Sequence, residues 1–184
     1  MLDPQASGLM VLRDDTVINV AALLQEPNGA TRNYRFVLGR FSLDVDLIAT
    51  DVVGTLRLTR LHDALLARGT GQTSVELECQ RCLNQFLYPV TFTFDEQFRI
   101  AYDVRRGTEI VSAEEGIDER PELSESHELD FGEPMRQEII LELPMRPDCG
   151  PECPGPPVFS ESGDDDVNNA FSALAALLER DEQK

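Results

Sequence analysis

Apolar and polar residues alternate with a period of two through the middle of the chain, from about residue 34 to residue 102. Such alternation predicts β-strands with one buried and one exposed face. Glycine and aspartate separate the alternating stretches at short intervals. We therefore expect an antiparallel β-sheet or small barrel of five or six strands, one of them in the stretch "HDALLARG". The alternating apolar residues are Leu43, Val45, Leu47, Leu56, Leu58, Val75, Leu77, Val90, Phe92, Phe94, Phe98, Ile100 and Tyr102.

Helical spacing replaces this alternation on either side of the sheet. A short helix is expected around residues 17–24, where Asp14, Asp15 or Thr16 can cap its first turn. The stretch "LDFGEPMRQEIILELP" predicts a second helix, capped by Asp130 and packed on the sheet through Met135, Ile139 and Leu143. Glu133 stands three residues after Asp130, at the spacing of a capping box.

A third helix is predicted near the end of the chain in "DVNNAFSALAALLER". Its apolar residues Val167, Phe171, Leu174 and Leu178 share one face. This face can pack against the rest of the protein or bind a partner, and the pattern leaves both possibilities open. The predicted fold class is α+β: an antiparallel sheet or small barrel with a packed helix and a C-terminal amphipathic helix.

Charge divides the chain unevenly. The 16 basic and 34 acidic residues give a net charge of -18, of which residues 107–184 carry -16. Together with the patterns above, this distribution predicts five segments. They are an N-terminal segment with a short helix (1–31), an antiparallel β domain with the first cysteine pair (32–102), an acidic mobile loop (103–128), a helix with the second cysteine pair (129–155), and an acidic linker with the C-terminal helix (156–184).

The four cysteines form two close pairs. Cys79 and Cys82 make a C-x2-C motif, and Cys149 and Cys153 make a C-x3-C motif after a gap of 66 residues. Two such pairs can supply four thiolates to a structural, tetrahedral zinc ion. Metal-free thiols and a redox dithiol remain alternatives. A thioredoxin-type dithiol, however, is expected in a βαβ unit at a helix N-terminus, whereas a predicted antiparallel strand precedes Cys79.

Other function classes find little support in the sequence. The two histidines are isolated, and neither a phosphate-binding loop nor a nucleophile elbow is present, so we expect no enzyme activity. The apolar runs are far shorter than the ~20 residues of a membrane-spanning helix. The first residues lack the positive and apolar regions of a signal peptide. We expect a cytoplasmic protein without a small-molecule substrate.

Several ordered stretches resemble the YceD-like family of large ribosomal RNA subunit accumulation proteins, a family first catalogued as a domain of unknown function. The similar stretches are "VINVAALLQEPNGATRNY", "GTLRLTRLHDALLARGTGQTSVELECQRCL", "ELDFGEPMRQEIILELPMRPDC" and "DVNNAFSALAALLER". The resemblance implies a non-enzymatic ribosome-biogenesis factor that supports accumulation and processing of large-subunit (23S) ribosomal RNA. Many members have further cysteines after the position of Cys153, and this chain has none.

The resemblance does not say which molecule the protein contacts. A net charge of -18 disfavours extended phosphate contact by the whole chain. One possibility is that arginines of the sheet contact ribosomal RNA, with Arg57 and Arg81 as the best candidates. Another is that the acidic second half shields a basic large-subunit ribosomal protein. A zinc- or thiol-based redox protein unrelated to ribosomes is the alternative of a different class.

Overall fold

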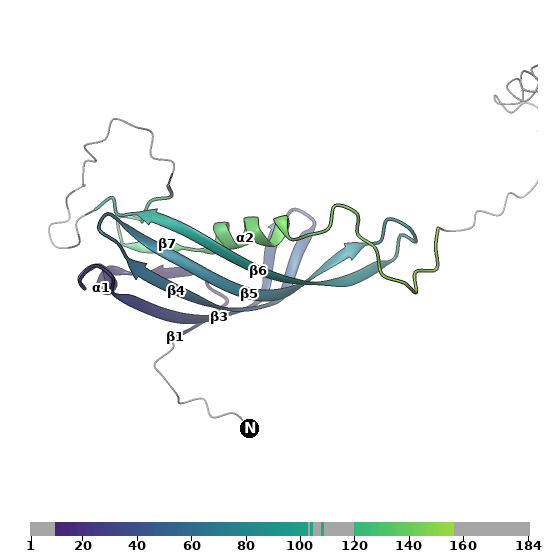
Figure 1. Ribbon diagram of the computed structural model, residues 1–184, viewed down its shortest axis with the longest axis horizontal. Helices are drawn as coiled ribbons and strands as arrows, with labels where there is room; N and C mark the ends of the chain where they lie inside the picture. Colours follow the sequence, from purple (N-terminus) through teal and green to yellow (C-terminus); the bar gives the residue numbers. More distant parts are fainter. Residues whose placement is uncertain (1–9, 103, 105–107, 109–119, 157–184) are drawn as a thin grey trace, which may run out of the picture. The chain divides into compact units, whose positions relative to one another are not determined.

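A five-stranded sheet dominates the structure (Figure 1). The computed structural model describes residues 10–102, 104, 108 and 120–156. The chain divides into two compact units, Met1–Pro154 and Gly155–Lys184. All the strands and helices described below belong to the first unit, and so do the four cysteines.

The sheet has the strand order β1-β3-β4-β5-β6. Strands β3 to β6 follow one another as antiparallel hairpins, and β1 pairs with β3 in parallel. Their alternating residues face the core or the solvent, as the period of two predicts. The strands are β1 (Met10–Arg13), β3 (Thr31–Asp44), β4 (Leu47–Arg60), β5 (Ala64–Glu78) and β6 (Gln85–Arg99).

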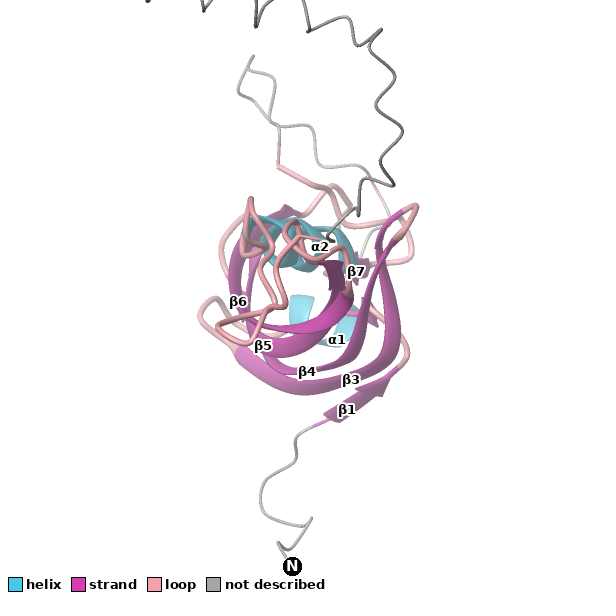
Figure 2. Cartoon of the chain, turned by 90° about the vertical axis from the view of Figure 1, so that its right-hand side faces the viewer, coloured by secondary structure: helices cyan, strands magenta, loops and turns pink. Residues whose placement is uncertain are grey.

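Helix α2 (Gly132–Leu141) covers one face of the sheet. Figure 2 shows the sheet curling into an open half-barrel, with α2 across its concave side. The helix packs against β6 and β3. A two-stranded antiparallel sheet of β2 (Val17–Asn19) and β7 (Glu128–Asp130), with the short helix α1 (Ala21–Leu24), completes the described elements. We call the sheet face turned away from α2 the outer face.

The predicted α+β class is wrong, because the protein is mostly β. Its described residues form seven strands and two helices, and the longer helix has only ten residues. The main sheet is also not wholly antiparallel, since β1 joins it in parallel. The apolar side chains on the concave face of the sheet are buried by α2, which packs against β6 and β3. The predicted C-terminal amphipathic helix lies outside the described residues, as does most of the predicted acidic loop.

The first helix begins later than its sequence indicates. Val17 and Ile18 lie in β2 and pair with β7, because β-branched side chains suit a strand. The carboxylate of Asp15 accepts a hydrogen bond from Val17 N at 2.9 Å, so it shapes the turn before β2 instead of capping a helix. Helix α1 then spans only Ala21–Leu24, after Val20.

The second helix matches its prediction more closely. Met135 and Ile139 are fully buried against the sheet. Asp130 accepts a hydrogen bond from Gly132 N at 2.8 Å, but the N-cap position is Phe131, so the predicted capping box does not form. Glu133 instead pairs with Arg136 at 2.7 Å, and this contact lowers the pKa of Glu133 to about 2.

Three glycines make room for phenylalanine rings on the concave face. Gly54 lies under the ring of Phe36, and Gly69 and Gly71 lie under the rings of Phe94 and Phe92. These rings belong to the next strand in register, so each glycine lets an aromatic side chain lie flat across the sheet. Glycine is therefore required at these positions by close packing.

Replacement of Gly69 by alanine tests this packing. The added methyl group would overlap the ring of Phe94, which is buried and cannot move outward. We expect the free energy of unfolding to fall by about 1–3 kcal/mol, as for other overpacked cores. Gly39→Ala is the matched control, because its Cβ meets only Asp14 at 3.6 Å. Urea denaturation of both variants measures the difference, and equal stability would contradict the packing argument.

Candidate metal centre

The first cysteine pair lies in the tight turn between β5 and β6. Cys79 closes this turn, since its N–H donates to Asn84 O at 3.0 Å and its carbonyl accepts from Leu83 N at 2.9 Å. Leu83 has a φ of 62°, a left-handed conformation that returns the chain sharply toward β6. The backbone N–H of Arg81 points at the Cys79 sulfur at 3.5 Å. The turn thus presents both cysteines on one side.

The second pair lies in the segment that follows α2. Gly150 has a φ of 103°, and its N–H donates to the Asp148 carboxylate at 2.7 Å. The N–H of Cys153 donates to Gly150 O at 3.1 Å, which bends the chain between the two cysteines. A left-handed residue is needed in this bend, and glycine adopts that conformation without strain.

Three contacts hold this segment against the β5–β6 turn. Gln80 N donates to Pro147 O at 3.0 Å, and the Gln80 side chain donates to Met145 O at 3.4 Å. Arg81 pairs with Asp148 at 3.3 Å. These contacts come from the residues between and beside the cysteines, so they join the two cysteine segments directly.

The four sulfurs form a compact cluster. The Sγ atoms of Cys79 and Cys153 lie 3.8 Å apart, and those of Cys82 and Cys149 lie 3.7 Å apart. All four sulfur atoms are within 4.8 Å of one another. Four sulfurs placed tetrahedrally at the usual Zn–S distance of about 2.3 Å are about 3.8 Å apart. A disulfide requires about 2.05 Å, and all four cysteines are free.

The surroundings of the thiols shift their pKa values in different directions. The backbone N–H groups of Cys82 and Arg81 face the Cys79 sulfur and lower the pKa of Cys79 to about 6. Burial, together with the neighbouring thiol of Cys153, raises the pKa of Cys149 to about 12. Four thiolates at these distances would repel one another, and a divalent cation among them removes that repulsion. The chemistry of the donors therefore suits a thiophilic metal ion.

The two candidate RNA-binding arginines differ in position: Arg81 lies within the cysteine cluster, and Arg57 lies outside it. Arg81 is engaged with Asp148, so its first role is to hold the turn. Arg57 is exposed on β4, on the outer face. Sequence reasoning overlooked Asp148 and Gln80, which join the two cysteine segments. An aspartate two residues before a glycine, as in "DCG", is a turn signal that could have indicated the role of Asp148.

The comparison with known families bears on these residues directly. Residues 67–178 match the model of the family described as "Large ribosomal RNA subunit accumulation protein YceD". The chain belongs to the YceD family. The match begins within β5 and includes α2 and all four cysteines, so the cluster lies in the part that the chain shares with the YceD model. Neither the curated proteins nor the solved structures that were searched include a match.

Membership of the YceD family connects the chain with accumulation of large-subunit ribosomal RNA, as the family description states. The description names an effect on an RNA and no chemical reaction. Among the residues that the structure describes, no helix is long and apolar enough to span a membrane.

Proposed function

We propose that this protein is a non-enzymatic ribosome-biogenesis factor that supports accumulation and processing of large-subunit ribosomal RNA. The observation that carries this proposal is the YceD match over residues 67–178, more than half of the chain. The description of the family in terms of accumulation, instead of a reaction, supports a role in binding or assembly. The partner is the ribosomal RNA itself or a basic large-subunit ribosomal protein, which the acidic second half of the chain could attract.

The proposed role of the four-cysteine cluster is structural. A zinc ion held by Cys79, Cys82, Cys149 and Cys153 would fix the segment after α2 to the β5–β6 turn. The sulfur spacing and the contacts of Gln80 and Arg81 with the segment after α2 support zinc binding at this position. Zinc in a complete thiolate set leaves no open coordination position, which is consistent with a structural site.

Depletion of the protein in its source organism tests the biogenesis role. We expect a lower ratio of 23S to 16S ribosomal RNA and fewer large subunits in sucrose gradients, because unprotected or unprocessed RNA is degraded. Re-expression of the wild-type chain should restore both quantities. An unchanged ratio and an unchanged subunit profile after depletion would overturn the proposed function.

A thiol-based redox function is the second candidate, favoured by one observation. The lowered pKa of Cys79 makes it a thiolate at neutral pH, and thiolates are the reactive form of cysteine. Thiol titration and metal analysis of one reduced sample distinguish the two roles. Protected thiols with about one zinc per chain support the structural site, whereas metal-free thiols that cycle through a disulfide support redox function.

A further inference from the structure

The outer face of the sheet carries a line of arginines that the cysteine cluster does not use. Arg13 on β1 is two residues after Val11, which lies opposite Arg35 on β3. Arg57 on β4 is two residues after Thr55, which also lies opposite Arg35. Each of these three arginines is therefore a diagonal neighbour of the next. Arg57 is directly opposite Arg68 on β5. The line therefore crosses four adjacent strands, about 14 Å at the usual strand spacing. We call these four residues the arginine stripe.

The stripe is locally basic in a strongly acidic chain. A row is a set of outward-facing residues that lie opposite one another across neighbouring strands, and three such rows contain the four arginines. The only acidic residue in these three rows is Asp95, which pairs with Arg68 at 2.9 Å. The three rows thus carry a formal net charge of +3, against -18 for the whole chain. Charges more than about 8 Å apart in solvent are largely screened at physiological salt, so the stripe can attract an anion locally.

The arrangement within the stripe is unfavourable without an anion. Arg57 and Arg68 are opposite each other on neighbouring strands, and like charges in this position destabilise a sheet. No ion pair or side-chain hydrogen bond joins Arg13, Arg35 or Arg57 to another described residue, and all three are exposed. A bound polyanion would offset the repulsion and provide partners for all three guanidinium groups.

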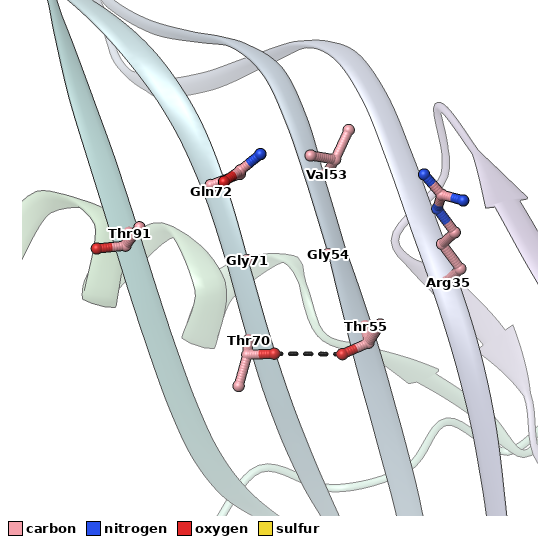
Figure 3. Close-up of a pocket in the computed structure, with 8 residues that line it drawn as sticks. All are labelled: Arg35, Val53, Gly54, Thr55, Thr70, Gly71, Gln72 and Thr91. Atoms are coloured by element: carbon pink, nitrogen blue, oxygen red, sulfur yellow. Dashed lines mark hydrogen bonds between the residues drawn. The ribbon is translucent and has the colours of Figure 1, made fainter. Parts of the chain in front are cut away.

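Hydroxyl and amide groups surround the stripe. An open depression of about 560 Å³ lies beside Arg35 on the outer face. Figure 3 shows Thr55, Thr70, Gln72 and Thr91 along the strands next to Arg35. Thr55 and Thr70 are joined by a hydrogen bond of 3.2 Å. Such groups donate to phosphate oxygens. The aromatic rings of β3 and β6 that border this region face the core, so this surface offers no platform for stacking unpaired bases.

We propose that the arginine stripe binds the phosphate backbone of helical RNA. The proposal deepens the proposed function, on which it rests, by assigning RNA contact to Arg13, Arg35 and Arg57. A convex face with arginines and hydroxyls, and without exposed aromatic rings, recognises backbone and shape instead of base sequence. The acidic parts of the chain would then limit RNA contact to this one face.

Fluorescence anisotropy with a labelled RNA hairpin of roughly 20 base pairs tests the stripe. This length is sufficient because protein domains that bind double-stranded RNA cover about 16 base pairs. For the full-length Arg35→Gln/Arg57→Gln variant we expect Kd to rise at least about tenfold. The slope of log Kd against log salt concentration should fall by about 2, one for each lost phosphate contact. Arg146→Gln, which removes an exposed arginine outside the sheet, should leave Kd close to the wild-type value.

Thermal unfolding of the same variants verifies their folding, and the Arg57 change should not lower Tm because it removes a like-charge pair. Equal RNA affinity of the wild type and the double variant overturns the stripe proposal. Absence of hairpin binding by the wild type, with binding to proteins extracted from the large subunit, also overturns it. Neither result affects the proposed function, which fails if depletion leaves both the 23S to 16S ratio and the subunit profile unchanged.

Discussion

Replacement of Phe131 by alanine is expected to lower the free energy of unfolding by about 3–5 kcal/mol, among the largest effects of any single substitution. Phe131 is fully buried at the start of α2. Its ring stacks on Phe94 at 6.3 Å and contacts Phe36 at 5.3 Å, so it joins the helix to both β6 and β3. Removal of the ring leaves a cavity between the helix and the concave face, and the curved sheet cannot collapse to fill it.

Urea denaturation and calorimetry measure this effect, and Tm should fall by roughly 10 °C. Phe131→Leu keeps most of the volume and should cost less than half as much. Leu87→Ala is a control for loss of an apolar side chain at the surface, since Leu87 is 66% exposed. A Phe131→Ala variant as stable as Leu87→Ala would show that α2 does not depend on this aromatic cluster.

Replacement of Cys149 by serine is expected to reduce bound zinc from about one ion per chain to near zero. The loss of one thiolate leaves three ligands and opens the cluster to water. The segment after α2 would then be held only by the hydrogen bonds of Gln80 and the ion pair of Arg81. We expect limited proteolysis to cleave within residues 145–154 in this variant, and in wild-type protein treated with a chelator.

Asp148→Asn provides the matched comparison, because it keeps all four sulfurs and weakens the Arg81 pair and the turn at Gly150. Its zinc affinity should fall by about 10–100-fold, the usual effect of losing a partner around the metal ligands, while its stoichiometry stays near one. Metal analysis and competition with a chromogenic chelator give both quantities. A wild-type protein purified without metal, and unable to bind added zinc, would contradict the site.

Local patterns of the sequence anticipated much of the fold and part of the candidate site. The alternation from Leu56 to Phe98 indicated strands β4 to β6, because burial of one sheet face depends mainly on local spacing. The run of Leu43, Val45 and Leu47 was wrongly assigned to one strand, since Val45 lies in the turn between β3 and β4 and is 90% exposed. The two cysteine motifs predicted a four-sulfur cluster, and the four sulfur atoms do lie close together. The C-x2-C motif also follows the end of a strand, as expected. The start of the first helix was predicted less well from its capping residues, because Val17 and Ile18 pair with β7 and form a strand instead.

The parallel pairing of β1 with β3 could not be read from the sequence, because four residues carry too little pattern to select a partner strand. The roles of Gly54, Gly69 and Gly71 were equally hidden. Glycine within a strand usually signals a bulge or a break, and only the rings lying across these glycines explain them. The α+β prediction was wrong because the two described helices, Ala21–Leu24 and Gly132–Leu141, are much shorter than the strands of the sheet.

The sequence by itself determined the long alternating strands, the amphipathic α2 and the two cysteine pairs, because each depends on residues close together in the chain. Only the tertiary structure decided that Cys79 meets Cys153 across 74 residues, and that Arg13, Arg35, Arg57 and Arg68 form one line. Both arrangements depend on strand register and on the return of the chain after α2. Register in these hairpins follows from the geometry of each turn and from bulges as well as from the hydrophobic pattern, and the alternation alone does not contain the turns and bulges.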